Sequence, residues 1–179
     1  MWEVHPMAEP DADEATLDLT KDPSFIEHAV RVLGDSELTY GLDRQQLAQL
    51  ATIAELRSYR PDELICREHE LSDELYIIES GDVAIWLDPA SVGRTGEPMR
   101  RIAELHPGQT CGELALLDGG VRSAQIRSGN QGVRLAVFKR DQLLALCEAD
   151  TAIGFRLMRN LAGALALRLR LQDMQLYDK

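Results

Sequence analysis

The sequence predicts an α+β fold: an antiparallel β-barrel of the jelly-roll type (a double-stranded β-helix), preceded by helices and followed by one long helix. Three observations predict it. Apolar residues recur at helical spacing early in the chain. Short runs rich in Ile, Val and Tyr, separated by turn residues, fill the middle at a spacing typical of small barrels. Helical spacing returns from Asp141 onward. A length of 179 residues suits one compact domain with extensions.

The first 23 residues are strongly acidic. They contain seven Asp or Glu residues against Lys21 alone, a net charge of −6, together with three prolines. This composition is typical of a flexible, solvated segment, and a docking or autoinhibitory role is the alternative. We therefore expect an acidic flexible tail over 1–23, helices plus barrel over 24–150, and a C-terminal lid or dimerisation helix over 151–179.

Two helices are expected before the barrel. PSFIEHAVRVL, residues 23–33, has apolar residues at helical spacing. LDRQQLAQLATIAEL, residues 42–56, begins with Asp43 where an N-cap belongs. Its apolar side is expected to face the core and consists of Leu47, Leu50, Ala51 and Ala54.

The expected strands follow Tyr59. They are ELICREH, ELYIIES, DVAIWLD, RRIAEL, SAQIRS and VRLAVF. In VRLAVF, apolar residues alternate with Arg134 and Ala136, the period of a strand with one buried face. Turn residues separate the runs at Pro61-Asp62, Ser80-Gly81-Asp82, Gly93 to Gly96 and Pro107-Gly108.

A short helical piece after Asp141 leads into TAIGFRLMRNLAGALALRLRLQDMQL, which reads as one long helix. Its apolar stripe from Leu157 to Leu169 is broad. The stripe either packs on its own barrel or pairs with a second copy, and its width favours a homodimer. The arginines of this helix are expected to form a solvated or partner-facing side: Arg156, Arg159, Arg168 and Arg170.

Composition disfavours several classes of protein. The net charge of −11 repels nucleic acid and anionic membranes. No apolar run reaches the ~20 residues of a membrane helix, and the N-terminus lacks the pattern of a secretory signal. The three cysteines form no CxxC pair, so neither a zinc site nor a disulfide framework is indicated. We expect buried, reduced thiols and a cytoplasmic location.

The stretch TCGELALLDGGVRSAQI, residues 110–126, carries the strongest chemical signal. A short helix after Gly112 would present unpaired amide groups and a positive dipole end to an anion, with no side chain in the way. Arg122 suits two phosphate oxygens. Glu113 would repel a phosphate but accept a hydrogen bond from a sugar hydroxyl. Alternatively, GELALL is an ordinary helix turn and Arg122 pairs with Glu113 or Asp118.

This stretch resembles the phosphate-binding cassette of the cyclic nucleotide-binding domain family, which includes catabolite activators and protein kinase A regulatory subunits. The matching residues are Gly112 to Leu117 and Arg122 to Ala124. SDELYIIESGDVAIW and LHPGQTCGE resemble the family's middle hairpin and cassette lead-in, so the likeness runs from about Leu47 to Leu169.

The resemblance implies roles for six residues. Arg122 would hold the cyclic phosphate and Glu113 the ribose 2′-hydroxyl. Ser123 would reach a phosphate oxygen through its hydroxyl or amide. Main-chain groups would come from Gly112, Leu114 and Ala115. The helix from Thr151 onward would be the lid that closes over the base.

Four departures from the family pattern stand out. Asp62 and the Glu68-His69-Glu70 turn occupy positions where the family has glycine, which concerns loop shape. Val121 stands where proline is common, and Cys111 where an aromatic or aliphatic residue is common. None of these departures removes an implied ligand contact.

The expected function is a stand-alone cyclic nucleotide sensor that signals to an unidentified protein partner by moving its C-terminal helix. The ligand is cAMP or cGMP, with cAMP favoured, and no other cofactor or metal is expected. The chain ends about ten residues after the apolar stripe, which leaves no room for a helix-turn-helix domain. Scattered histidines and the absence of a nucleophile argue against an enzyme. A degenerate, ligand-free interaction module is the alternative.

Overall fold

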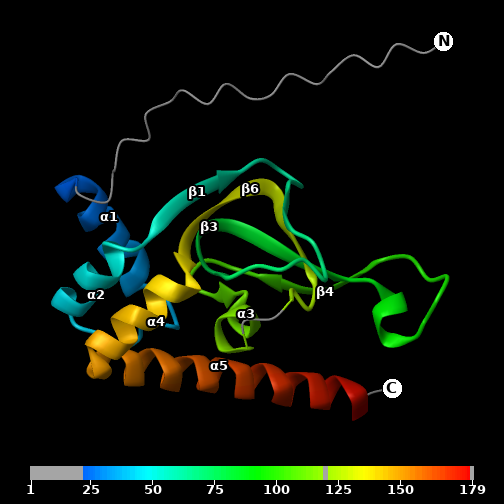
Figure 1. The fold of residues 1–179 in the computed structure, drawn as a ribbon. Coiled ribbons are helices and arrows are strands. Elements are labelled where there is room, and N and C mark those ends of the chain that lie inside the picture. Colours follow the sequence, from blue (N-terminus) through cyan, green and yellow to red (C-terminus); the bar gives the residue numbers. More distant parts are fainter. Residues whose placement is uncertain (1–21, 119–120, 178–179) are drawn as a thin grey trace, which may run out of the picture.

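The computed structural model describes residues 22–118 and 121–177, and it has the predicted architecture of helices, barrel and a long C-terminal helix (Figure 1). The predicted α+β fold class with an antiparallel barrel is confirmed. The helices are α1 (Pro23–Gly34), α2 (Arg44–Ala51), α3 (Glu113–Asp118), α4 (Arg140–Ala149), α5 (Thr151–Tyr177) and the short 3₁₀ helix η2 (Pro89–Val92). The strands are β1 (Glu55–Tyr59), β2 (Leu64–Cys66), β3 (Glu74–Leu87), β4 (Arg100–Leu105), β5 (Thr110–Cys111) and β6 (Gln125–Lys139).

Two long strands, β3 and β6, form the spine of the antiparallel sheet, whose order is β1-β6-β3-β4. The short strands β2 and β5 add to β6 and β3. The predicted turn at Ser80-Gly81-Asp82 is wrong: β3 runs through it with shifts in register. Gly81 (φ 78°) lies against Gly132 (φ 77°), and a Cβ on Gly81 would collide with the Gly132 carbonyl. The two strands therefore bend together at a bulge, and both remain continuous.

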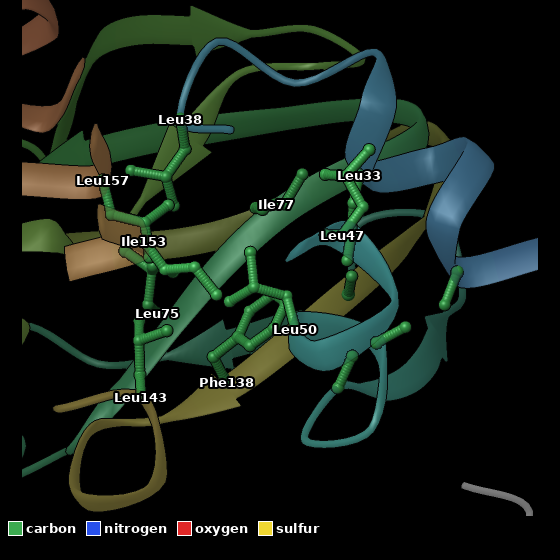
Figure 2. Close-up of a cluster of buried hydrophobic side chains, with 14 of the residues drawn as sticks. Leu33, Leu38, Leu47, Leu50, Leu75, Ile77, Phe138, Leu143, Ile153 and Leu157 are labelled. Atoms are coloured by element: carbon green, nitrogen blue, oxygen red, sulfur yellow. The ribbon is translucent and has the colours of Figure 1, made fainter. Parts of the chain in front are cut away.

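Apolar side chains form two clusters, one on each side of this curved sheet. Figure 2 shows the larger cluster, where α1, α2, α4 and the first half of α5 pack on β3 and β6. The second cluster fills the barrel interior. Ala136 belongs to the helix-covered face and Leu135 to the interior, and both are fully buried, so β6 is covered on both faces here. The helices thus cover one face of the sheet, and Leu116 of α3 packs into the same cluster.

The second helix is shorter than predicted. Asp43 is its N-cap, as expected, and forms a capping box with Gln46. The helix ends at Ala51, and β1 begins at Glu55, so the prediction of a helix through residue 56 is wrong. Ala54 is still fully buried. Ala54 fits the apolar spacing of the helix because it faces the core, but it does so from the turn that connects α2 to β1. The spacing therefore suggested a longer helix than the structure has.

Two tight turns keep the barrel's loop shape without glycine. Asp62 and His69 take left-handed backbone conformations, with φ of 58° and 65°. These are the positions at which the sequence departs from the glycines of the family pattern. Non-glycine residues rarely adopt such angles, although Asp and His are among those that tolerate them. The departures therefore leave the backbone path intact.

The N-terminal acidic segment lies outside the described residues, apart from its last two positions. Asp22 caps α1 by accepting a hydrogen bond from Ser24, and Pro23 is the first helical residue. The three cysteines are free thiols: Cys66 and Cys111 are buried, and Cys147 is half-buried. Among the described helices, none has the length and hydropathy needed to cross a membrane.

Candidate functional site

The short helix α3 begins directly after β5, and Gly112 joins the two. Gly112 has φ of 82°, a conformation that favours glycine. A Cβ at this position would lie 2.7 Å from the Glu74 carbonyl oxygen and would collide with the Arg122 guanidinium. The glycine therefore allows both the turn into α3 and the close approach of Arg122 to the backbone.

A backbone pairing positions Arg122. Its amide donates to the Glu70 carbonyl (2.9 Å), and its carbonyl accepts from the His69 amide (2.8 Å). A bridge between Leu71 and Val121 extends the pairing. The turn that departs from the family pattern at His69 thus contacts the cassette directly, so its shape bears on the site as well as on the loop.

The side chain of Arg122 is almost fully buried, at 3% exposure. Its Nη2 donates to Ser72 Oγ (2.7 Å) and to the Tyr76 hydroxyl (3.0 Å). Its Nη1 lies 3.5 Å from the Gly112 carbonyl oxygen, a long contact. The guanidinium also lies 4.9 Å from the centre of the Tyr76 ring, a cation–π contact. The ring and two hydroxyls therefore fix the direction of the guanidinium.

A hydrogen-bonded chain continues from Tyr76 to the surface. The Tyr76 hydroxyl donates to Glu74 (2.9 Å), and Arg57 pairs with Glu74 (2.8 Å) and Glu55 (2.6 Å). Burial alone would raise the pKa of Glu74, but hydrogen bonds from Arg57 and Tyr76 outweigh it and hold the pKa below its usual value. Burial raises the pKa of the Tyr76 phenol. The tyrosine is therefore a neutral acceptor for Arg122.

Arg122 nevertheless lacks a full set of partners. Its buried Nε has no hydrogen-bond acceptor, and among the described side chains no carboxylate lies within ion-pair distance of it. The alternative prediction was a surface pair of Arg122 with Glu113 or Asp118. Arg122 is buried and Glu113 pairs elsewhere, and the Asp118 side chain lies outside those that the structure describes. A buried cation without an anion is costly unless a ligand supplies one. Among the described side chains, the site therefore suits an anionic ligand.

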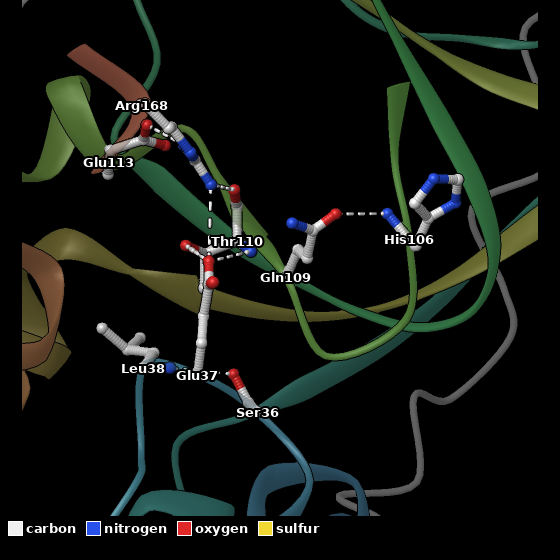
Figure 3. A network of polar contacts seen from close by, with 8 residues as sticks. All are labelled: Ser36, Glu37, Leu38, His106, Gln109, Thr110, Glu113 and Arg168. Atoms are coloured by element: carbon white, nitrogen blue, oxygen red, sulfur yellow. Dashed lines mark hydrogen bonds and ion pairs between the residues drawn. The ribbon is translucent and has the colours of Figure 1, made fainter. Parts of the chain in front are cut away.

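Glu113 is also buried, at 8% exposure, and its partner is Arg168 of α5. Figure 3 shows Arg168 between three acceptors: the Glu113 carboxylate, the Thr110 carbonyl (2.6 Å) and the Glu37 carboxylate (3.4 Å). Glu37 comes from the loop after α1, so this network joins the cassette, the N-terminal helices and α5. The prediction that Arg168 lies on a solvated side of the helix is therefore wrong.

A pocket of ≈ 220 Å³ opens between the cassette and the barrel. Its polar part consists of Arg122, Glu113, Ser123 and Arg168, and its apolar part comes from β3, β4 and the cassette. Five of the six predicted site residues line it, and the sixth, Ala115, lies in α3. The apolar lining residues are Ile85, Ile102, Ala103, Leu105, Leu114, Val121, Ala124 and Ile126. Cation, carboxylate and apolar wall together suit a ligand with an anionic group, a hydroxyl and a flat ring.

The lining of the pocket also includes a thiol. Cys111 lines the pocket, and burial, followed by the nearby Glu113 charge, raises the pKa of its thiol. The thiol is therefore protonated at neutral pH. Over residues 22–118 and 121–177, no cluster of three or more His, Cys, Asp or Glu side chains is arranged to hold a metal ion.

Residues 56–150 match the family model described as "Cyclic nucleotide-binding domain". The chain belongs to the cyclic nucleotide-binding domain family. Among curated members, the Cyclic AMP receptor protein of Thermus thermophilus is 30% identical over 141 residues, covering 79% of this chain. The chain spans only 61% of that relative's length.

Solved structures of the family share the fold. The regulatory domain of Toxoplasma gondii PKA, crystallised with cAMP, superposes with a TM-score of 0.59 at 28% identity, covering 70% of this chain and 46% of that one. A cyclic nucleotide-binding domain from Methylobacillus flagellatus has a TM-score of 0.73 at 22% identity, covering 87% of this chain and 85% of that one. The family assignment agrees with the resemblance found in the sequence.

Proposed function

We propose that this protein is a cyclic nucleotide sensor that binds cAMP or cGMP in the pocket beside α3. The observation that carries the proposal is the buried guanidinium of Arg122, which has no carboxylate partner among the described side chains and an Nε without an acceptor. A cyclic phosphate would supply the missing negative charge, and Arg122 is held by Ser72 and Tyr76 in a fixed direction for it.

The remaining contacts follow the chemistry of each group. Amides at the start of α3, from Gly112, Leu114 and Ala115, supply main-chain donors for the phosphate, and Ser123 adds a hydroxyl or amide. Glu113 accepts the ribose 2′-hydroxyl. No described donor contacts Oε2 of Glu113, since Arg168 uses Oε1, so one carboxylate oxygen is available to the sugar. The apolar wall receives the base.

The signal is a change in α5. Ligand energy acts only through a difference between two states, and Arg168 links α5 to the carboxylate proposed for the ribose. Movement of α5 would change the surface offered to a protein partner or to a second copy. The first half of the predicted stripe, Leu157 and Leu161, is buried in the protein's own core. A homodimer would therefore use the exposed leucines towards the end of α5, which are Leu169 of the stripe together with Leu167 and Leu171.

The protein acts as a regulatory domain and not as an enzyme, in our proposal, and its free thiols, two of them buried, are in keeping with a cytoplasmic location. Related chains in the family include regulatory parts of larger proteins, such as a "cGMP-dependent protein kinase, isozyme 1" of Drosophila melanogaster, 29% identical over 123 residues, covering 68% of this chain and 15% of that one. The choice between cAMP and cGMP depends on base contacts along the apolar wall.

Thermal unfolding with added nucleotide tests the proposal. At 100 times its Kd, a ligand adds about 2.7 kcal/mol to the free energy of unfolding. We expect cAMP or cGMP at millimolar concentration to raise Tm, whereas linear 5′-AMP, with its doubly charged phosphate, should give a smaller shift. Arg122→Glu should abolish the shift. If neither cyclic nucleotide changes Tm, the sensor proposal fails, and the chain is the ligand-free interaction module.

A further inference from the structure

A second concave surface lies along α5, on turns of the helix that precede Arg168. One face of α5, with spacings typical of a single helical stripe, meets the loop that follows α1, and the groove between them has a volume of ≈ 470 Å³. Asn160 fixes the two together, since its Nδ2 donates to the carbonyls of Leu38 (2.8 Å) and Tyr40 (2.9 Å). The lining residues are Glu37, Tyr40, Arg156, Arg159, Asn160 and Gly163.

This groove carries unmatched positive charge on an acidic protein. Arg156 is half-buried against Gly41, where an added Cβ would lie 2.5 Å from its Nη1. Arg159 is exposed. Within residues 22–118 and 121–177, neither arginine has a carboxylate at ion-pair distance. The groove's own carboxylate, Glu37, already contacts Arg168 (3.4 Å). Two guanidinium groups therefore remain available to an acidic partner, although the chain as a whole has a net charge of −11.

The floor of the groove is suited to an extended segment rather than to a free anion. Tyr40 is 79% exposed, an unusual position for a large aromatic side chain. At Gly163 no atom lies within 4 Å of an added Cβ, so the helix surface is open there. The aliphatic stems of the two arginines complete an apolar base with charged ends. A peptide with carboxylates and small apolar side chains complements this surface.

We propose that the acidic segment of this same chain, residues 9–16, docks in this groove. These eight residues contain four Asp or Glu side chains and no Lys or Arg, with three alanine or threonine side chains among them. Charge complementarity favours this segment over the neutral or basic parts of the chain.

The chain is long enough to reach. The groove adjoins the loop at the C-terminal end of α1, so the segment must run back along a helix of 12 residues, about 18 Å. Glu14 precedes the N-cap Asp22 by eight residues, which span up to about 26 Å when extended. Docking would clamp α5 to the α1–α2 loop, next to the Glu37–Arg168 contact. This inference does not depend on nucleotide binding.

A tryptophan reporter in the segment tests the docking in the full-length chain. The two native tryptophans are replaced (Trp2→Phe and Trp86→Phe), and Thr16→Trp introduces the reporter. We expect its fluorescence anisotropy to be high at 10 mM salt and to fall at 1 M, because the screening length shortens from about 30 Å to about 3 Å. Reversal of both groove charges, Arg156→Glu with Arg159→Glu, should lower the anisotropy at 10 mM salt to the high-salt value.

Two matched variants keep this test decisive. The control variant, Arg94→Glu with Arg100→Glu, changes the net charge by the same amount as the groove variant, but at exposed residues that do not line the groove. It should leave the anisotropy high. A segment variant removes three of the negative charges and changes no residue of the groove: Asp11→Asn, Asp13→Asn and Glu14→Gln. It should lower the anisotropy of the reporter. The proposal would be overturned if the parent, the groove variant and the segment variant all gave the same anisotropy at 10 mM salt. A rise in anisotropy with protein concentration would identify a second copy as the occupant and would overturn it as well.

Discussion

The unpaired state of Arg122 makes an unusual prediction about stability: Arg122→Met should cost little in the ligand-free protein. The substitution loses two hydrogen bonds to neutral hydroxyls, of Ser72 and Tyr76, each worth about 1.5–3 kcal/mol to a charged donor. It also removes a guanidinium that is 3% exposed and has no carboxylate partner among the described side chains, and the burial of such an ion costs several kcal/mol. The two effects nearly cancel, so we expect a change within about 1 kcal/mol.

Arg57→Met is the matched control. Arg57 has two carboxylate partners, Glu55 (2.6 Å) and Glu74 (2.8 Å), and its removal leaves Glu74, whose side chain is 18% exposed, without a cation. Arg57 is itself about a third exposed, so we discount the 3–5 kcal/mol typical of fully buried pairs to about 1–3 kcal/mol. The paired arginine should therefore matter more for stability than the more deeply buried one.

Urea unfolding at pH 7, with and without cAMP or cGMP, measures both effects. The parent protein should gain about 2.7 kcal/mol at 100 times Kd, and Arg122→Met should gain nothing. Arg57→Met should lose stability and still respond to nucleotide. The reasoning is refuted if Arg122→Met, without nucleotide, loses more stability than Arg57→Met. That result would make Arg122 a structural cation whose electrostatic needs are already met.

Three further substitutions probe the same site. Gly112→Ala should lower the free energy of unfolding by about 1–3 kcal/mol and displace Arg122, since the new Cβ meets the backbone at φ of 82°; urea unfolding and nucleotide titration check both effects. Tyr76→Phe removes one acceptor but keeps the ring, so a loss of about 1–2 kcal/mol with weaker nucleotide binding is expected, and unchanged affinity would exclude a positioning role. Arg168→Gln strips the buried Glu113 of its cation and should cost about 1–3 kcal/mol by urea unfolding, whereas a neutral effect would show that the pair is dispensable.

The barrel's strand content was readable from the sequence, but its connections were not. A glycine flanked by serine and aspartate predicts a turn, yet Gly81 forms a bulge because Gly132 faces it across the sheet with a similar left-handed conformation. The same local chemistry serves a turn and a bulge, and only the partner strand decides between them. Strand β1 was missed for a related reason. Burial of Ala54 fits a helix as well as it fits a turn, so the sequence did not reveal that the helix ends before β1 begins.

The site was predictable where it is contiguous. Gly112, Glu113 and Arg122 lie within eleven positions, so one short motif places all three. Arg168 is 55 residues from Glu113 and belongs to a helix with several arginines. One signal was available: Leu157, Leu161 and Leu165 follow one face of α5, and Arg168 continues that face three residues later. A charged residue on an otherwise inward-facing stripe calls for a buried partner.

The three acceptors around Arg168 determine how readily α5 can respond to a ligand. A guanidinium with one buried carboxylate partner would resist release, because release would leave both charges unpaired. Arg168 instead also donates to the Thr110 carbonyl and lies 3.4 Å from Glu37, so it keeps two acceptors when a ligand takes up Glu113. Glu113, in turn, would exchange a cation for a hydroxyl donor and remain hydrogen-bonded. Since neither side is left without a partner, the free-energy difference between the two arrangements is small. A ligand with modest preference for one of them can then shift α5, which is the condition for a switch.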